Sequence, residues 1–188
     1  YGVSPSVRVF GPWAGSLDNA GERVTLRNKN GVVAASVRFG DTHPWPVAPD
    51  GAGHSLVLVD ADRAIDDYRR WGTSSRVGGN PGASDGVVIS PLAINEVHFD
   101  QEGDVDWIEI YNSSDTPKGV EGYFLSGARG FGDRVSISGS VPAGGYLTFD
   151  VSFSNNSVAF LVDENNVVRS AVAYDRDAGR DHVAAYPD

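Results

Sequence analysis

Turn-forming residues punctuate this chain so closely that they leave no room for long helices. Clusters of Gly, Pro, Asn and Asp separate short runs in which β-branched and aromatic residues recur or alternate with polar ones, a pattern typical of strands. One stretch, residues 62–71, has helical spacing but is too short to change the fold class. The expected strands cover residues 7–10, 22–28, 32–40, 54–60, 92–99, 106–112, 134–138, 146–153, 158–163 and 167–175. The chain is therefore predicted to be all-β, as a sandwich or a barrel.

One strand–turn–strand pattern occurs twice. Residues 26–39 read LRNKNGVVAASVRF and residues 161–174 read LVDENNVVRSAVAY, which match at an offset of 135 positions. The identical residues are Leu26/Leu161, Asn30/Asn165, Val32/Val167, Val33/Val168 and Val37/Val172. Each copy places Asn-Gly or Asn-Asn between two strand-like runs, and such pairs favour the two positive φ angles of a type I′ turn. The sequence predicts the same β-hairpin in both halves, with a coincidence of turn chemistry as the alternative.

Charge divides the chain into two unlike halves. Residues 1–90 carry nine acids and nine bases, whereas residues 91–188 carry 16 acids and six bases and hold the whole net charge of −10. An acidic surface repels phosphate, which argues against nucleic acid and anionic lipid as partners. No apolar run is long enough to insert into a membrane. The Gly-rich stretch 78–86 lies between the halves, so we expect one unit over residues 1–86 and a second over residues 87–188.

The two units are incomplete in opposite ways. Only residues 1–17 precede the hairpin of the first unit, whereas residues 92–150 precede that of the second, which ends soon after its hairpin. This order indicates the back part of one unit followed by the front and middle of another. The chain also begins at Tyr1 and contains no Met, as expected for a mature product or a piece of a longer protein. With no Cys, it forms no disulfide and no zinc–thiolate site.

Several blocks of the chain resemble the lamin-tail domain family in its bacterial, exported form. The front blocks of that family correspond to AINEV at residues 93–97, DWIEIYN at 106–112, VEGYFL at 120–125 and VPAGGYL at 141–147. The back blocks correspond to Gly15-Ser16-Leu17, Asn19, Gly21-Glu22, Pro44-Trp45-Pro46, Asp50-Gly51, Ser55-Leu56, Trp71 and Pro81-Gly82. The first unit departs from the family because it lacks the front blocks, and Asn80 stands where Thr is more usual.

This resemblance implies immunoglobulin-like β-sandwich units of the lamin-tail type. It also implies an extracellular or cell-surface setting, because bacterial copies are commonly attached to secreted or surface proteins. Members of the family are regarded as interaction or architectural modules and not as enzymes. The resemblance therefore favours a second unit over residues 87–188 that lacks only its last segment.

An acidic cluster between two expected strands is the best candidate metal site. Asp100, Glu102, Asp104 and Asp106 place four carboxylates within seven residues, around a single Gly. Calcium takes about six to eight hard oxygen ligands, and alternating acids in a tight loop can supply several of them. The spacing is not that of an EF-hand. We expect either a calcium site, with calcium as the one candidate cofactor, or a solvated acidic loop.

The expected strand over residues 106–112 has two different faces. Ile108 and Ile110 share one face and are predicted core residues, while Trp107 and Tyr111 share the other. An exposed pair of aromatic rings can stack on a sugar or a protein, and packing beneath a loop is the alternative. These rings favour, as an alternative function, a carbohydrate-binding module supported by calcium.

No catalytic constellation emerges from the sequence. The segment GHSLV at residues 53–57 resembles a nucleophile elbow but lacks the second Gly and leads into an apolar strand. The triplets at residues 112–114 and 155–157 match the N-glycosylation pattern, which matters only for a eukaryotic source. We expect a non-catalytic, exported module that mediates adhesion or assembly. Its partner is a protein, a neighbouring copy of itself or a glycan, since a sandwich that lacks strands exposes sheet edges.

Overall fold

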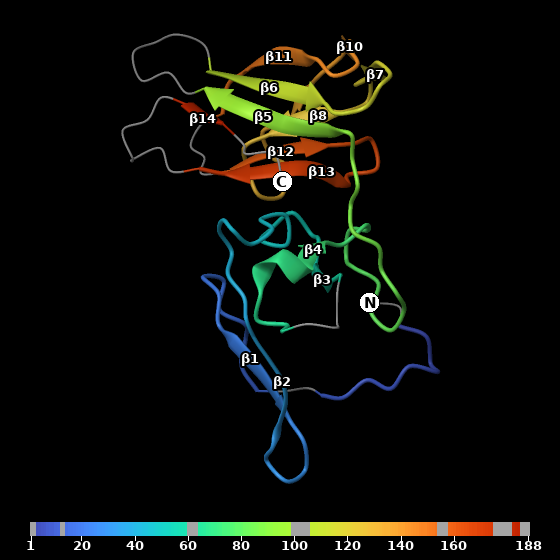
Figure 1. Cartoon of the computed structure of the whole chain (residues 1–188), viewed down its shortest axis with the longest axis vertical. Helices are drawn as coiled ribbons and strands as arrows, with labels where there is room; N and C mark the ends of the chain where they lie inside the picture. Colours follow the sequence, from blue (N-terminus) through green and yellow to red (C-terminus); the bar gives the residue numbers. More distant parts are fainter. Residues whose placement is uncertain are drawn as a thin grey trace. The chain divides into compact units, whose positions relative to one another are not determined.

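Strands make up nearly all the regular structure of the protein (Figure 1). The computed structural model describes residues 3–11, 14–59, 64–98, 106–153, 158–174 and 182–184. Among them the one helical element is a 3-10 turn, η1 (Tyr68–Arg70), so the all-β prediction is confirmed. None of the described helical segments has the length and apolar character needed to cross a membrane. The chain divides into two compact units, Tyr1–Val87 and Val88–Asp188.

The first unit contains two separate antiparallel pairs of strands. One pair is β1 (Arg23–Arg27) with β2 (Val33–Arg38), and the other is β3 (Leu56–Leu58) with β4 (Trp71–Thr73). The strand expected over residues 7–10 does not form. The side chain of Phe10 there is 88% exposed, and no described strand pairs with this run. β-branched residues make a strand only where a partner strand is available.

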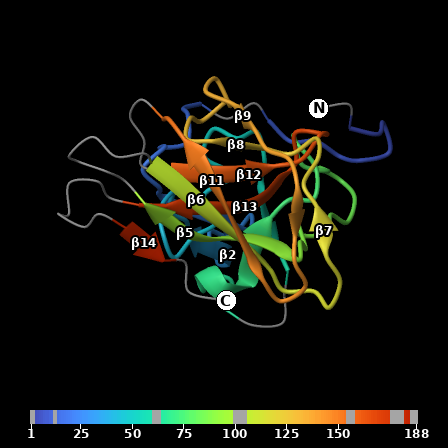
Figure 2. The ribbon, with the colours of Figure 1, turned by 90° about the horizontal axis from the view of Figure 1, so that it is seen from above.

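The second unit is a sandwich of two four-stranded sheets that share one core. The strand order is β11-β6-β5-β14 in the first sheet and β13-β12-β8-β9 in the second, with β10 and β7 as a separate pair. Figure 2 shows the strands of the first sheet crossing over those of the second. The strands are β5 (Leu92–His98), β6 (Asp106–Asn112), β7 (Lys118–Gly119), β8 (Phe124–Ser126), β9 (Val135–Ser136), β10 (Ser140–Val141), β11 (Tyr146–Val151), β12 (Val158–Val162), β13 (Val168–Ala173) and β14 (His182–Ala184).

Period-two alternation along β5 and β6 builds the core of the second unit. Ile108 and Ile110 are fully buried, as predicted, and Ile94 of β5 lies opposite Ile110. A register shift between Ile94 and Glu96 then returns Val97 to the same face. The core joins Leu92, Ile94, Val97, Ile108, Ile110, Val120, Leu125, Ile137, Val141, Val151, Phe153, Ala159, Leu161 and Tyr174.

Strand β12 is buried on both of its faces. Ala159 and Leu161 point into the core, whereas Phe160 points to the other side of the sheet. Phe131, from the Gly-rich loop after β8, packs edge-on against Phe160 with ring centroids 5.7 Å apart. The backbone of Phe131 is left-handed (φ 59°), a conformation that L residues with a side chain seldom adopt. This loop therefore serves as a cover for the sheet.

The repeated sequence forms a repeated hairpin. Adding 135 to each residue number of β1 and β2 gives the bounds of β12 and β13. The register shifts at the same step, between Leu26 and Arg27 in one hairpin and between Leu161 and Val162 in the other. The two copies thus share their pairing as well as their sequence.

The prediction of a two-residue type I′ turn in these hairpins is wrong. In the first copy only Gly31 has positive φ (78°), and the loop is three residues long, closed by Gly31 N to Asn28 O (2.9 Å) and Asn28 N to Val32 O (2.9 Å). The Asn28 side chain explains the difference, because its Oδ1 accepts the backbone N–H groups of Asn30 (2.9 Å) and Val32 (3.0 Å). A turn followed by one left-handed residue is the usual three-residue hairpin loop.

Asp163 performs the same role in the second copy. Its Oδ1 accepts the N–H groups of Asn165 and Val167, both at 2.9 Å, and Asn166 is the left-handed residue (φ 59°). The other carboxylate oxygen accepts two hydrogen bonds from the guanidinium of Arg169, at 2.8 and 2.6 Å. The loop geometry is therefore set by one side chain at the end of the first strand.

Asn112 at the end of β6 is built into the fold. It is fully buried, its Nδ2 donates to the carbonyl groups of Thr116, Val141 and Pro142, and its Oδ1 accepts from Ser114. An amide with these partners is not available to an oligosaccharide, so the glycosylation reading of residues 112–114 is wrong. The second triplet, residues 155–157, lies outside the described residues.

Candidate functional site

The outer face of the β6 sheet carries two aromatic pairs. Trp107 stacks on His98 with ring centroids 5.2 Å apart and planes at 15°, and Tyr111 lies 4.9 Å from Tyr146 of β11. Trp107 and Tyr111 are both half-buried, while Tyr146 is 52% exposed. The two predicted ligand-binding rings thus each pack against a neighbouring ring, Trp107 stacked on His98 and Tyr111 tilted against Tyr146. Tyr146, which the sequence reading missed, offers more surface, and only its register opposite Tyr111 reveals it.

The structure describes one of the four acids predicted to bind calcium. Asp100, Glu102 and Asp104 lie outside the described residues, whereas Asp106 is the first residue of β6, opposite Val151. Within the described part of the chain, no group of three or more His, Asp or Glu side chains is arranged to hold a metal ion. The calcium site stays a prediction.

The elbow-like segment at residues 53–57 has a structural role. His54 is buried, and its Nδ1 donates to the carbonyl of Ser74 (2.8 Å). The backbone N–H of Ser55 donates to Ser74 Oγ (3.0 Å). These bonds extend the β3–β4 pairing, and the chain continues from Ser55 directly into a strand instead of a helix. The geometry is that of a strand connection and not of a nucleophile elbow.

A cavity of about 440 Å³ opens onto one face of the β1–β2 hairpin. We call it the hairpin cavity. Its apolar lining includes Val24 and Val37, which lie opposite each other across the hairpin, together with Phe39, Leu56 and Trp71. Three carboxylates also line it, from Asp18, Asp41 and Asp50, and its lining contains no Lys or Arg. The cavity combines an apolar wall with net negative charge.

The same face of the hairpin is covered in the second unit. Ala159 and Leu161 belong to the core there, and the backbone N–H of Ile94 on β5 donates to Ser170 Oγ of β13 (3.0 Å). The equivalent of Leu161 in the first unit is Leu26, which is 64% exposed. None of the described strands of the first unit covers this face as β5 does in the second. The hairpin cavity therefore corresponds to the space that an opposing sheet fills in a complete sandwich.

The hairpins also differ at one edge. β12 is hydrogen-bonded to β13 on one side and to β8 on the other, whereas β1 is paired with β2 alone among the described strands. The backbone N–H of Asn28 donates to Val32 O, so the backbone groups of Asn28 and of every second residue before it point toward β2. It follows that the backbone groups of Arg23, Thr25 and Arg27 point toward the open edge. In the second unit the equivalent of Thr25, Phe160, lies opposite Ser126 of β8.

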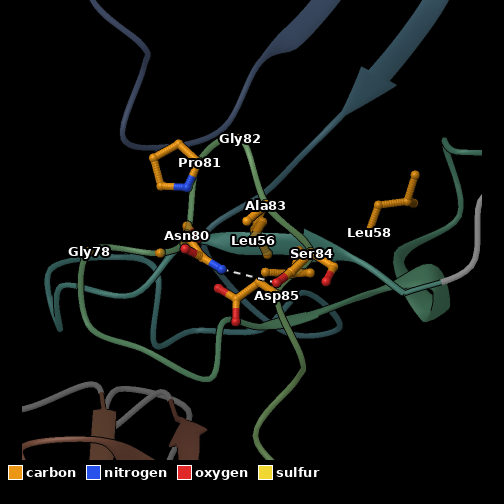
Figure 3. A pocket seen from close by; sticks show the side chains of 12 residues that line it. Leu56, Leu58, Gly78, Asn80, Pro81, Gly82, Ala83, Ser84 and Asp85 are labelled. Carbon is orange, nitrogen blue, oxygen red and sulfur yellow. Dashed lines mark hydrogen bonds between the residues drawn. The ribbon is translucent and has the colours of Figure 1, made fainter. Parts of the chain in front are cut away.

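A second hollow of about 560 Å³ lies between β3 and the loop at residues 78–85 (Figure 3). The loop is braced by a hydrogen bond from Asn80 Nδ2 to Ser84 O (3.0 Å) and by Asp85, whose Oδ1 accepts from Ser75 Oγ. Asp85 is the one ionisable residue in the lining, and its other oxygen is buried with no hydrogen-bond partner in the described structure. A single carboxylate in a Gly- and Pro-rich wall is no basis for acid–base chemistry.

An exposed ion pair ties the β1–β2 hairpin to the segment before η1. Asp66 accepts a hydrogen bond from the backbone N–H of Arg38 (2.5 Å) and another from the guanidinium of Arg23 (3.1 Å). The Arg38 bond and then the Arg23 bond hold the pKa of this carboxyl below its ordinary value. The hairpin is thus anchored from its polar face, while its apolar face lines the cavity.

No family model matches the chain, and no curated protein or solved structure matches it significantly. The candidate site accordingly rests on the geometry of this chain alone. Sequence reasoning found the hairpin and foresaw open sheet edges, but it did not identify the cavity. The repeat could have pointed to it, because the described strands of the first unit include no counterpart of those that cover β12–β13 in the second.

Proposed function

We propose that the chain is a non-catalytic interaction module whose first unit binds an extended segment of a partner polypeptide. The segment adds as a strand to the open edge of β1, next to Thr25. One observation carries the proposal: the same hairpin is built twice in the same register, with β8 on the outer edge of β12 and no described strand on the outer edge of β1. Strand addition to an exposed edge is a common mode of peptide recognition.

Exposed apolar side chains support a binding role for the first unit. Nine of the eleven large apolar side chains that are exposed in the described structure belong to it, among them Leu26 on the hairpin. A single exposed apolar residue is normal for a protein surface, but a concentration in one unit is typical of surfaces that bind partners.

The charges on β1 oppose pairing between two copies of the same edge. If two β1 strands paired antiparallel about Thr25, Arg23 of one copy would lie opposite Arg27 of the other. Like charges directly opposite each other destabilise a sheet. We therefore place a different polypeptide strand at this edge. The resemblance to bacterial lamin-tail domains supports an exported or cell-surface setting, in which such binding would serve adhesion or assembly.

A peptide spanning residues 121–128 tests the proposal, because it contains the β8 sequence that pairs with the equivalent hairpin. The labelled peptide is titrated with the full chain, and binding is followed by fluorescence anisotropy. Thr25→Pro removes the backbone N–H that faces the open edge, and we expect at least tenfold weaker binding (about 1.4 kcal/mol). Thr25→Ala is the matched control, since it loses the hydroxyl contact with Ser36 but keeps the N–H. Equal binding to the wild-type and Thr25→Pro chains would exclude the proposal.

A second candidate function is carbohydrate binding on the outer face of the β6 sheet. The observation that favours it is the row of aromatic pairs, with Tyr146 more than half exposed beside Tyr111. A glycan array probed with the wild-type chain and with Tyr146→Ala tests it. Binding that Tyr146→Ala weakens, with the sheet intact by circular dichroism, would support this function, and silence across the array would weigh against it.

A further inference from the structure

An added strand at the edge of β1 would direct every second side chain toward the hairpin cavity. In the second unit Leu125 of β8 lies opposite Leu161, and both belong to the core. If a partner strand pairs with β1 in the register that β8 has on β12, the partner residue equivalent to Leu125 lies opposite Leu26. The next residue on the same face, which corresponds to Gly127, then lies opposite Val24, and Val24 lines the hairpin cavity.

The lining of the hairpin cavity selects the chemistry of that side chain. Val24, Phe39 and Trp71 offer hydrocarbon and aromatic surface, and the indole of Trp71 is held by a hydrogen bond to the carbonyl of Ile65 (2.9 Å). Lys and Arg bury their methylene groups against such surfaces while the charged end reaches a polar region. An aromatic ring face also attracts the cationic group itself.

The carboxylates of the cavity supply the partner for a positive charge. Asp18, Asp41 and Asp50 line the same space, which has no Lys or Arg in its lining, and the one His there, His54, is buried with its Nδ1 bonded to the carbonyl of Ser74. Within the described part of the chain, the carboxylate of Asp41 makes neither a hydrogen bond nor an ion pair, so it has no internal cation to neutralise it. An entering ammonium or guanidinium group would gain charge-assisted hydrogen bonds, whereas an entering carboxylate would be repelled.

We infer that the hairpin cavity receives a Lys or Arg side chain of the partner strand, from the position opposite Val24. This inference rests on the proposed strand addition and names the chemistry of the partner: an extended segment with an apolar residue opposite Leu26 and a basic residue two positions further on. The cavity then provides specificity, while the backbone of β1 provides the sequence-independent part of the binding.

Three variants of the 121–128 peptide test the inference, with Lys, norleucine or Glu in place of Gly127. Norleucine has the lysine hydrocarbon chain without the ammonium group, so the Lys and norleucine peptides differ only in that group, with its charge and its hydrogen-bond donors. Against the full chain in low salt, we expect the Lys peptide to bind about tenfold more tightly than the norleucine peptide and the Glu peptide to bind most weakly. The advantage of Lys should shrink in high salt, since the cavity is open to solvent.

Variants of the protein assign the effect to the cavity. Asp41→Asn should weaken the Lys peptide toward the affinity of the norleucine peptide and leave the norleucine peptide unchanged. Asp67→Asn is the matched control, because Asp67 lies outside the cavity lining and its loss changes the net charge equally. Thermal melting of each variant checks that the fold is retained.

The possible failures are distinguishable. Equal binding of the Lys and norleucine peptides overturns the inference and leaves strand addition in place. A Lys advantage that persists in the triple variant Asp18→Asn, Asp41→Asn, Asp50→Asn also overturns it, because the carboxylates would then have no part in the preference. If no peptide binds at millimolar concentration, both the proposed function and the inference are wrong.

Discussion

The β1–β2 and β12–β13 hairpins have the same backbone and opposite surroundings. Their registers coincide, yet all five residues of β12 are buried and four of the five in β1 are exposed. Hairpin geometry therefore arises locally, from the side chain of Asn28 or Asp163 and the left-handed residue after it. Burial arises from neighbouring strands. Among the described strands, the first hairpin thus has no counterpart of the neighbours that complete the sheet and the core around the second.

The two hairpins differ in sequence mainly on the face that points away from the core side. On the cavity face the first copy is apolar, and the core face of the second is apolar except for Ser170, with Leu26 matching Leu161. On the other face Thr25 and Arg23 take the places of Phe160 and Val158. Water covers the polar face without cost, whereas Phe160 needs the cover that Phe131 provides. The polarity of the outer face therefore indicates whether that face of each hairpin is covered by protein or by water.

The largest expected difference between the hairpins comes from truncating the matched leucines. Leu161→Ala should destabilise the second unit by about 2–5 kcal/mol, because it leaves a cavity in a closed core. Leu26→Ala should change the stability of the first unit by less than about 0.5 kcal/mol, because that side chain is already mostly in water. Hydrogen exchange by mass spectrometry in increasing urea reads the two units separately.

The contrast between the two hairpins would be wrong if both leucine variants lowered the free energy of unfolding of their units by the same amount. In that event Leu26 would be buried in solution by something that the described strands do not provide. Val57→Ala, in the half-buried strand β3, is a control for general sensitivity of the first unit to lost apolar volume.

The second largest effect concerns the side chain that closes each loop. Asp163→Ala removes two backbone acceptors and the partner of Arg169 at a site that is 3% exposed, and we expect a cost of about 2–3 kcal/mol. Asn28→Ala removes the same two backbone bonds in an exposed loop where water replaces them, so we expect about 1 kcal/mol or less. Urea unfolding of each variant measures the difference. Arg169→Leu keeps the loop bonds, and it separates the ion pair from them.

Much of the sandwich could be predicted from the sequence because apolar and polar residues alternate along its long strands. The strand at residues 106–112 matches β6, and the hairpin strands match within a few residues. The short strands β4 and β8 escaped prediction. Three residues carry too little pattern, and each of these strands is defined by the neighbour that pairs with it. The run at residues 7–10 failed for the converse reason, since propensity without a partner makes no strand.

The candidate site was less accessible to sequence reasoning than the fold. Strand periodicity predicted the two strands of the first hairpin, but nothing local says that the face with Val24 and Val37 borders a cavity with Asp18 and Asp41. Cavities form where chain segments distant in sequence fail to fill space, and no periodicity reports that. The turn type was predicted wrongly for a similar reason, because the Asn28 side chain accepts a hydrogen bond from Val32 on the other side of the loop.

A smaller effect is expected at the left-handed loop residues. Gly31 has φ 78°, and a Cβ added there would meet no atom within 4 Å, so Gly31→Ala adds backbone strain and no clash, at a cost of about 1 kcal/mol. Asn166 already bears that strain at φ 59°, and Asn166→Gly should therefore be neutral or stabilise by up to about 1 kcal/mol. If the two loops are equivalent, thermal melting should show a lower melting temperature for Gly31→Ala and an unchanged or higher one for Asn166→Gly. A loss of stability in Asn166→Gly would show that the Asn side chain has its own role there.

The smallest effect is an acid response at the exposed Asp66 anchor of the first hairpin. The pKa of Asp66 lies below its ordinary value of 3.8, first because of the Arg38 N–H bond and then because of Arg23. A lowered pKa in the folded state means that ionised Asp66 stabilises the fold. This contribution is fully present above the ordinary value and is lost as pH falls through the lowered one. The chemical shift of the Arg38 amide, followed by NMR from pH 6 downward, should therefore stay constant down to the ordinary carboxyl pKa of 3.8 and change only below it, as the pH falls through the lowered pKa of Asp66. In Asp66→Asn the amide keeps an acceptor but no longer titrates, so a persistent transition in that variant would assign the response to another acid.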